Sequence, residues 1–344
     1  MATPKNNRLI IGIMLGILLY GTSCTNNASD AKSIATNNSS AITSGDPLPS
    51  WNEGDNKKAI IDFVKAVTTE GGSSFVNPGD RIATFDNDGT LWAEQPVIQL
   101  LFVFERVKQM AEGNPALKEQ QPFKAIIEND REYLKTLSEA DVIKLFVATQ
   151  TGMTESEFAK EAARFFSSAQ SPSGKPISQL VYQPQLELLN FLRANGFKTF
   201  ICSGGSVEFM RAISQQYYGI PPEQVIGTQF KYVYKDSSAV NDIVRQPALH
   251  SFNDKQEKPL NIQYFIGKRP ILACGNEGGG GDIYMLRFSQ GSSYPSLQLL
   301  INHDDKDREF YYQEKDNKSL DWAGKYNWHV VSMKNDWKTI FPGE

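Results

Sequence analysis

The chain has 344 residues, of which 40% are hydrophobic and 22% are charged, and its formal net charge is −4. Ample apolar residues with a small net charge exclude intrinsic disorder, and the length predicts one large domain or two modest ones. The absence of a Lys/Arg block of five residues argues against nucleic acid as a partner. The three cysteines, Cys24, Cys202 and Cys274, are too few for a disulfide framework and form no zinc motif.

The N-terminus has the pattern of a secretory signal. Two basic residues precede the apolar stretch 9–20, which is followed by small residues and Cys24. A stretch of 12 residues is shorter than the ~20 that span a bilayer, which favours a cleaved signal over a membrane anchor. Cys24 resembles the lipidated cysteine of bacterial lipoproteins, although Gly21 stands where that motif usually has leucine. We therefore expect residues 1–23 to be a signal peptide.

This signal predicts export to the periplasmic face of a bacterial membrane. A lipid on Cys24 would hold the chain there as its one contact with the membrane; without it the protein would be soluble in the periplasm or secreted. Residues 24–50, rich in Asn, Ser, Thr and Ala, have the composition of a flexible tether.

From Trp51 on, hydrophobic periodicity predicts alternating helices and strands. A helical face runs over 55–67, helical patterns with capped starts at Ser138 and Thr154 fill 96–166, and an alternating hairpin arm covers 229–234. Further helices are predicted at 185–194 and 207–218. Short apolar strands are predicted at 81–85, 197–202, 270–274 and 297–301.

Strands separated by helices predict an α/β fold with a parallel sheet. Each predicted strand ends in polar or glycine-rich residues. Ligands of such sheets bind at the carboxyl ends of the strands, so we expect these polar residues to converge on one site.

Asp86 and Asp88, directly after the first strand, are the first candidates for chemistry. In isolation they would be a solvated turn, since Asp-Gly favours turns. Against a phosphate monoester, however, one carboxylate can attack phosphorus to form an aspartyl-phosphate, and the other can protonate the leaving alkoxide. Their negative charge calls for a cation with oxygen ligands, such as Mg²⁺.

The later strand ends supply groups that suit a phosphate. The hydroxyl of Ser203 and the backbone at Gly204 and Gly205 can approach a phosphoryl oxygen, although Ser203 could instead be a helix N-cap. Lys258 can neutralise transferred charge, although most lysines are on the surface. Asp282 follows a run of four glycines and could complete a metal site.

In this order, Asp86-x-Asp88-Gly89-Thr90, Ser203-Gly-Gly, Lys258 and Gly275-Asn276…Asp282 resemble the four motifs of the haloacid dehalogenase-like (HAD) hydrolase superfamily. The likeness is greatest to its phosphoserine-phosphatase-like branch and covers about residues 81–301. It implies a Rossmann-like core, 51–92 and 186–344, with a helical cap inserted after the first motif, 93–185.

The resemblance also implies the roles of the site residues. Asp86 would be the nucleophile, Asp88 the acid/base, and Ser203 and Lys258 phosphate ligands, with Gly204 beside them. An acid at 88 favours a phosphatase over the superfamily's dehalogenases and transport ATPases. Asp282 would be an acid of the Mg²⁺ site.

The fourth motif departs from the usual Gly-Asp-x-x-x-Asp. Asn276 replaces an acid, and Glu277 and the four glycines lengthen the run before Asp282. Asn276 can still ligate a metal through its carbonyl, and Glu277 could supply the missing charge. The expected metal ligands are therefore Asp86, Asp88, Asp282 and Asn276, with Glu277 as a further candidate.

Several weaker features have two readings. Trp92, Glu94 and Gln95 could face the substrate or pack the cap on the core. For His303-Asp304-Asp305 a surface turn is favoured over a role beside the site. Cys202 and Cys274 fit buried small hydrophobes, and the aromatic-rich segment 310–337 is expected to pack on the core.

These observations predict an exported Mg²⁺-dependent phosphatase that hydrolyses a small phosphate monoester through an aspartyl-phosphate. Two alternatives stay open: a lipoprotein that binds a ligand or partner without turnover, suggested by the altered fourth motif, and a phosphotransferase to an acceptor other than water. Neither the identity of the substrate nor the oligomeric state can be read from the sequence.

Overall fold

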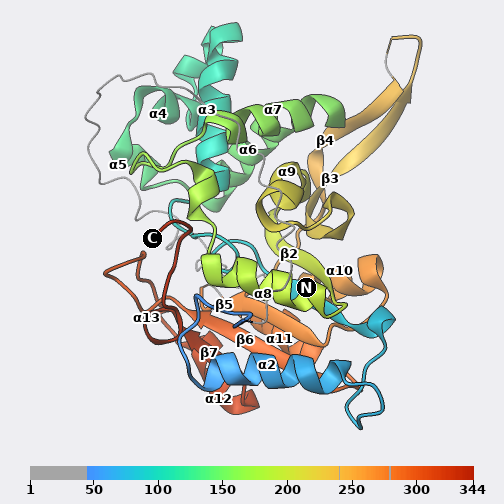
Figure 1. Cartoon of the computed structure of the whole chain (residues 1–344). Helices are drawn as coiled ribbons and strands as arrows, with labels where there is room; N and C mark the ends of the chain where they lie inside the picture. Colours follow the sequence, from blue (N-terminus) through green and yellow to red (C-terminus); the bar gives the residue numbers. More distant parts are fainter. Residues whose placement is uncertain (1–44, 240, 279) are drawn as a thin grey trace, which may run out of the picture.

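The computed structural model describes residues 45–344 except 240 and 279 (Figure 1). The predicted signal peptide, Cys24 and most of the predicted tether therefore lie outside the described residues. Within 45–344, leaving out those two positions, no helix combines the length and apolar character that crossing a bilayer requires.

A seven-stranded sheet forms the centre of the molecule, in the order β4-β3-β2-β1-β5-β6-β7. All neighbours pair in parallel except β3 and β4, which are antiparallel. The predicted α/β class with a parallel sheet is confirmed. The strands are β1 Ile82–Phe85, β2 Lys198–Ser206, β3 Val225–Asp236, β4 Asn241–Ser251, β5 Leu272–Asn276, β6 Leu297–Asn302 and β7 His329–Ser332.

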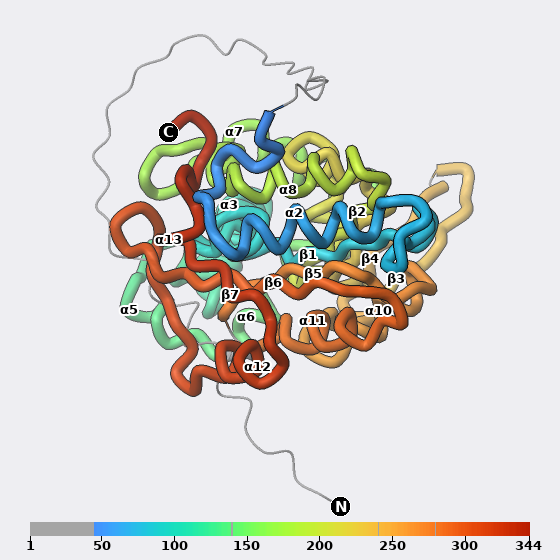
Figure 2. The backbone as a smooth tube through the Cα atoms, turned by 60° about the horizontal axis from the view of Figure 1, so that its bottom comes forward, coloured from blue at the N-terminus to red at the C-terminus, as the bar shows by residue number. Residues whose placement is uncertain are grey.

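Helices cover both faces of this sheet (Figure 2). On β6, Leu299 and Ile301 pack into the core on one side and Leu300 into the core on the other, as the period of two in a strand buried on both faces requires. One face is covered by α2 Asp55–Thr68 and α8 Gln183–Ala194 and the other by α10 Glu257–Ile266, α11 Ile283–Gln290 and α12 Lys318–Tyr326.

A helical layer is inserted between β1 and β2 and lies beside the β3–β4 hairpin (Figure 1). It has a hydrophobic cluster of its own around Val107, Phe123 and Leu145. The predicted capping boxes at Ser138 and Thr154 start two of its helices. Its helices are α3 Ile98–Gly113, α4 Phe123–Glu128, α5 Arg131–Leu134, α6 Glu139–Gln150 and α7 Glu155–Ser168.

Backbone hydrogen bonds and an ion pair join this layer to the β3–β4 hairpin. Arg245 of β4 donates its backbone N–H to the carbonyl of Met153 at 3.0 Å and accepts one from Gly152 at 3.0 Å. Its fully buried guanidinium also bonds Glu155 at 2.8 Å. The sequence predicted one arm of this hairpin but not β4 or its junction with the helices.

The remaining elements complete the chain. The predicted helix 207–218 consists of α9 Val207–Ile213 and a π turn, Ser214–Tyr218. Trp337, after α13 Met333–Asp336, is buried against Trp51 and Tyr182, so the closing role of the C-terminal segment is confirmed there. It is wrong for Phe310 and Tyr311, which are exposed. Short 3-10 turns lie at Pro78–Asp80, Pro115–Glu119, Ile177–Leu180 and Pro222–Gln224.

Candidate active site

The loop after β1 is held tightly against the end of β5. The Asp86 N–H donates to the carbonyl of Cys274 at 2.9 Å, and the Gly89 N–H donates to that of Trp92 at 2.8 Å. Gly89 has φ of 70°, and a Cβ there would collide with the side chains of Asn276 and Tyr312. Glycine is therefore required at 89 both for the turn and for the close approach of the loop.

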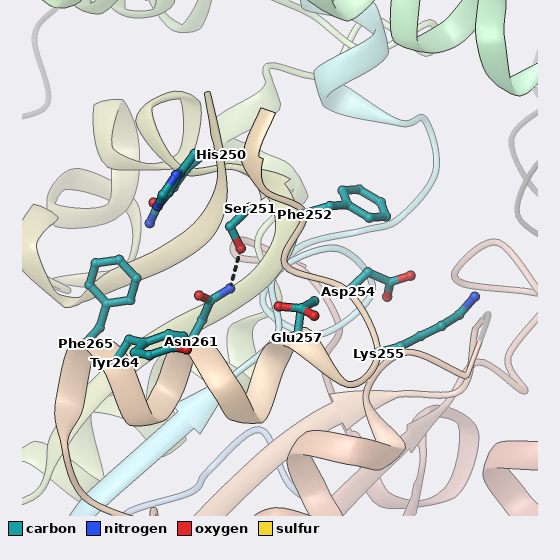
Figure 3. A pocket seen from close by; sticks show the side chains of 10 residues that line it. His250, Ser251, Phe252, Asp254, Lys255, Glu257, Asn261, Tyr264 and Phe265 are labelled. Atoms are coloured by element: carbon teal, nitrogen blue, oxygen red, sulfur yellow. Dashed lines mark hydrogen bonds between the residues drawn. The ribbon is translucent and has the colours of Figure 1, made fainter. Parts of the chain in front are cut away.

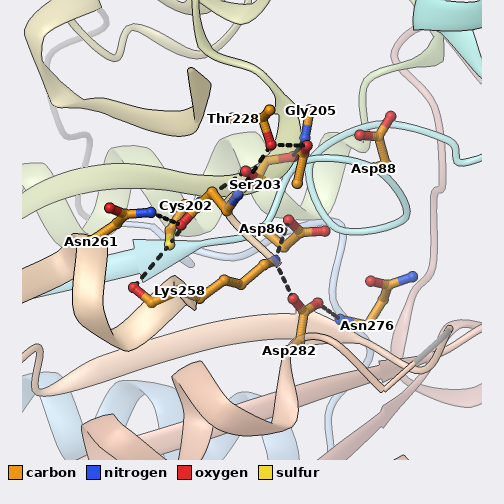
Figure 4. A network of polar contacts seen from close by, with 12 residues as sticks. Asp86, Asp88, Cys202, Ser203, Gly205, Thr228, Lys258, Asn261, Asn276 and Asp282 are labelled. Carbon is orange, nitrogen blue, oxygen red and sulfur yellow. Dashed lines mark hydrogen bonds and ion pairs between the residues drawn. The ribbon is translucent and has the colours of Figure 1, made fainter. Parts of the chain in front are cut away.

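Asp86, Lys258 and Asp282 form one buried cluster, which we call the charged cluster (Figure 4). Lys258, in the first turn of α10, places its Nζ 2.7 Å from Asp86 Oδ1 and also bonds Asp282 Oδ1. The three residues are between 3% and 6% exposed. The structure thus brings together three residues that lie far apart in the sequence.

The end of β5 fixes the position of Asp282. Its Oδ2 accepts the backbone N–H of Asn276 at 2.9 Å. A Cβ at Gly275 would lie 2.5 Å from the Asp282 side chain. Glycine at this position therefore allows the aspartate to approach the strand end.

The charged cluster has more negative than positive charge. Burial and the neighbouring Asp282 carboxylate raise the pKa of Asp86 well above its ordinary 3.8, against the opposing effect of Lys258. Burial disfavours the charged lysine, yet the two carboxylates raise the pKa of Lys258 above its ordinary value, so it stays protonated. A further positive charge would stabilise this arrangement.

Asp88 lies on the same loop, beside the cluster (Figure 4). Its Oδ1 accepts a hydrogen bond from Trp92 Nε1 at 2.9 Å. Burial raises the pKa of Asp88, which helps it to hold a proton as a general acid must. Trp92 itself is buried against Phe166 and Tyr218, so it both packs between the layers and orients Asp88.

Ser203 lies within β2 and is not a helix N-cap, because the strand continues to Ser206 and α9 begins only at Val207. Its Oγ accepts the Gly205 N–H at 3.1 Å. Together with Gly204 and Gly205 it lines the same cavity as Asp86.

Two residues that the sequence analysis missed hold this strand end. Thr228 donates its hydroxyl to the Gly204 carbonyl at 2.7 Å, and Asn253 donates its side-chain amide to the Ser203 carbonyl at 2.8 Å. Their one sequence signal is position: Thr228 lies on the strand next to β2, and Asn253 comes shortly before Lys258.

Asn276 lies between Asp282 and two further polar side chains, those of Glu94 and Tyr312. Its side-chain nitrogen donates to Glu94 Oε2 at 3.0 Å and to the Tyr312 hydroxyl at 2.7 Å. In Figure 4 its oxygen end is on the side of Asp86 and Asp282. This orientation leaves the amide oxygen facing the charged cluster.

Glu277 does not join that cluster, which corrects the idea that it supplies the missing charge. Its carboxylate accepts the backbone N–H of Glu314, and it is not among the residues that line the cavity. The carboxylate instead holds the segment around 314 against β5.

The donor chemistry here fits Mg²⁺. In the described part of the chain no three His, Cys, Asp or Glu side chains are grouped closely enough to bind a metal by themselves. An ion at this place would therefore need Asn276 or a backbone carbonyl together with Asp86 and Asp282. All of these donors are oxygens, which Mg²⁺ prefers, and the excess negative charge suits a divalent cation.

His303 is part of a second cluster, the support cluster, made of His303, Glu309 and Tyr312. His303 Nε2 lies 2.8 Å from the Gly89 carbonyl oxygen and Nδ1 lies 3.2 Å from Glu309 Oε2. The imidazole stacks on Tyr312 with ring centroids 4.2 Å apart. Burial opposes its protonation, but the bond to Glu309 and its charge raise the pKa of His303 above 6.5.

The predicted surface turn at 303–305 is therefore wrong. His303 is 0% exposed, and Asp305 is buried and bonded to Arg308. Glu309 and Tyr312, from the irregular segment that follows, fold back onto His303, a contact that local turn signals do not reveal.

The charged cluster forms the floor of a cavity of about 450 Å³. Glu94 and Gln95 also line it, and burial raises the pKa of Glu94 to about 7. The walls away from the floor are mostly apolar. Their apolar residues are Val97, Val142, Ile143, Phe146, Val147, Phe230, Leu249 and Phe252, and the polar side chains of Gln99, Ser206, Thr228 and Asp254 also line the cavity.

A second hollow of about 820 Å³ lies between β4 and α10 (Figure 3). His250, Tyr264 and Phe265 are on one side of it, and Phe252 and Asp254, on the other, also line the first cavity. None of the predicted site residues lines this hollow.

The two described cysteines are confirmed as buried core residues. Burial raises the pKa of both Cys202 and Cys274 to about 12. Neither thiol forms the thiolate that a nucleophile requires.

Comparison with known proteins agrees with this geometry. Residues 83–260 match the family model described as haloacid dehalogenase-like hydrolase. A conserved, functionally unknown protein from Anaerococcus prevotii is similar in structure, with 14% identity over 86% of this chain and 98% of that chain and a TM-score of 0.54.

Two further solved structures are more distant in fold. A protein of unknown function from Bordetella pertussis has 13% identity over 73% of this chain and 97% of its own, with a TM-score of 0.47. A phosphoserine phosphohydrolase-like protein from Francisella tularensis has 16% identity over 70% and 98%, with a TM-score of 0.36. No curated protein matches the sequence.

Proposed function

The chain belongs to the haloacid dehalogenase-like hydrolases, and on this basis we propose that it is a Mg²⁺-dependent phosphatase acting on a small phosphate monoester through a phosphorylated Asp86. The observation that carries the proposal is the charged cluster at the floor of the cavity, with Asp88 beside it. A nucleophile, an acid and a cation are thereby available within one buried site.

The first half of the reaction uses Asp86 and Asp88. Lys258 engages Oδ1 of Asp86, which leaves Oδ2 to attack phosphorus. As the Oδ2–P bond forms, the bond from phosphorus to the ester oxygen breaks, and Asp88 gives its proton to the leaving alkoxide. The raised pKa of Asp88 and its bond to Trp92 suit this task.

The second half regenerates the enzyme. Asp88, now a carboxylate, takes a proton from water, whose oxygen attacks phosphorus and displaces Asp86 as a carboxylate. Throughout, the Ser203 hydroxyl is available to the phosphoryl oxygens, while Lys258 offsets their charge. When bound by Asp86, Asp282, Asn276 and a backbone carbonyl of the Asp88 loop, Mg²⁺ would add neutralisation of the phosphoryl charge.

The test is hydrolysis of a panel of phosphate monoesters by the purified protein, with and without Mg²⁺. Hydrolysis should require Mg²⁺, and Asp86→Asn should lower turnover by roughly a thousandfold or more. Asp80→Asn is the matched control, since the Asp80 side chain is partly exposed, bonds Lys268 and Tyr294, and does not line the cavity. Absence of Mg²⁺-stimulated hydrolysis, or retained activity in Asp86→Asn, would overturn the proposal.

The same assay separates the two alternatives. Turnover above background rules out a purely ligand-binding lipoprotein, and added alcohols that appear as phosphorylated products would indicate phosphoryl transfer in place of hydrolysis. Free inorganic phosphate as the main product supports the phosphatase.

We also propose that the protein is exported and anchored by a lipid on Cys24, on the evidence of its signal-like N-terminus. Cys24→Ala should move the protein from the membrane fraction to the soluble fraction, whereas Cys202→Ser should not. Equal fractionation of Cys24→Ala and the natural chain would contradict lipidation.

A further inference from the structure

The cavity above the charged cluster has an apolar roof. We define the roof as the side chains that α6 and the hairpin region turn toward the cavity. From α6 these are Val142, Ile143, Phe146 and Val147, and from the hairpin region Phe230, Leu249 and Phe252.

The helix α6 carries apolar side chains on two sides. Leu145 is fully buried in the core of the inserted layer, where Val142 and Phe146 pack against it. A helix that is buried on one side only would be polar on the other. Instead Ile143 and Val147, one turn apart, line the cavity. Packing within the inserted layer therefore does not explain why these two residues are apolar.

Part of the roof is open to solvent. Ile143 is 46% exposed and Phe252 is 50% exposed. A ligand that covers such apolar side chains gains free energy in proportion to the apolar area removed from water. The roof therefore favours the binding of an apolar group next to the phosphate.

The charges around the cavity disfavour a second anionic group on the ligand. Among the described residues that line it, Lys258 is the one basic side chain, and both Asp86 and Asp282 already engage it. The walls add the acids Glu94 and Asp254. A carboxylate or a second phosphate on the substrate would meet these acids without a cation of its own.

We propose that the substrate is the monophosphate of a neutral, largely apolar alcohol, with an aromatic or aliphatic group under the roof. This inference rests on the proposed phosphatase function and narrows its substrate. The reaction stays balanced as a hydrolysis: the ester P–O bond breaks, water supplies the new oxygen on phosphorus, and the alcohol leaves with a proton. Amino-acid phosphates are disfavoured by their additional charges.

The test compares esters that share a primary alkoxide leaving group, so that their chemical reactivity is matched. Benzyl phosphate is compared with para-carboxybenzyl phosphate, phosphoserine and glycerol phosphate, all with Mg²⁺. We expect kcat/KM for benzyl phosphate to exceed that for para-carboxybenzyl phosphate by at least roughly tenfold, because one unpaired charge in the cavity is costly.

A positive charge placed in the roof should reduce the preference for benzyl phosphate over para-carboxybenzyl phosphate. Ile143→Lys would give the para-carboxylate a partner and should shift the ratio of the two kcat/KM values toward para-carboxybenzyl phosphate by roughly tenfold. Lys144→Gln is the control on the same helix, since Lys144 bonds the Gln121 carbonyl and does not line the cavity.

The outcomes separate the two levels of the proposal. Equal kcat/KM values for benzyl and para-carboxybenzyl phosphate in the natural protein would overturn the substrate class while leaving the phosphatase intact. Failure to hydrolyse any ester with Mg²⁺ would overturn the phosphatase itself. The comparison in the natural protein needs no variant, so it decides the question even if Ile143→Lys does not fold.

Discussion

Two buried polar clusters meet at Asn276, and they differ in charge and in access. The charged cluster has two carboxylates against one ammonium and opens into the cavity. The support cluster pairs one imidazole with one carboxylate, and its members do not line the cavity. Unbalanced charge next to a cavity suits the binding of a cation and a phosphate, whereas balanced charge behind it suits the positioning of the loop.

Removing the lysine ammonium of the charged cluster should have the largest effect on stability and activity. Lys258→Met leaves two buried carboxylates without a partner, which we expect to lower the free energy of unfolding by about 3–5 kcal/mol and to abolish activity. Lys268→Met breaks an exposed pair with Asp80 and should cost about 0–1 kcal/mol. Urea unfolding without divalent cations measures both. Similar losses in the two variants would contradict the special role of the charged cluster.

A smaller effect should link the support cluster to the metal. Tyr312→Phe removes one of the two hydrogen bonds that orient the Asn276 side-chain amide and leaves only the bond to Glu94. We expect the Mg²⁺ concentration for half-maximal activity to rise roughly tenfold, as with other groups that orient metal ligands. Tyr311→Phe, which alters an exposed neighbour bonded to Gln313, should change nothing. An unchanged Mg²⁺ dependence in Tyr312→Phe would show that Asn276 needs no such support.

The smallest effect concerns pH. The pKa of His303 is raised above 6.5 in the folded protein, so its protonated form stabilises the fold below pH ~6.5 and this contribution is lost as pH rises through the raised value. The stability advantage of the natural protein over His303→Gln should therefore shrink between pH ~6 and ~8. Burial lowers the pKa of His329, so the advantage over His329→Gln should instead grow as pH rises toward 6.5.

Urea unfolding of both variants across this pH range provides the measurement. Parallel pH profiles for His303→Gln and the natural protein would mean that folding does not raise the pKa of His303, which would contradict this prediction.

The charged cluster could be predicted from the sequence and the support cluster could not. Asp86 follows β1 and Asp282 comes between β5 and α11, so the parallel topology brings the two aspartates together. Lys258, in the first turn of α10, could be assigned to them from the motif order of the superfamily that the sequence resembles. His303 acquires its role only because Glu309 and Tyr312 return from an irregular segment. Periodicity carries no information about such a segment.

The same reasoning explains why the central strands could be predicted from the sequence and β4 could not. The central strands are short and apolar, and their positions were predicted within a few residues. The strand β4 was missed because its residues are largely exposed or half-buried and show no clear alternation. Its place is fixed by Arg245, whose buried contacts with the inserted helices are long-range.

The central claim is that Asp86 carries the phosphoryl group during turnover. Acid quenching of the protein in steady state with a radiolabelled phosphate ester and Mg²⁺, followed by peptide mapping, tests it directly. We expect label on the peptide that contains Asp86 and none in Asp86→Asn. Rapid hydrolysis with no label on that peptide, or label on another residue, would contradict the account.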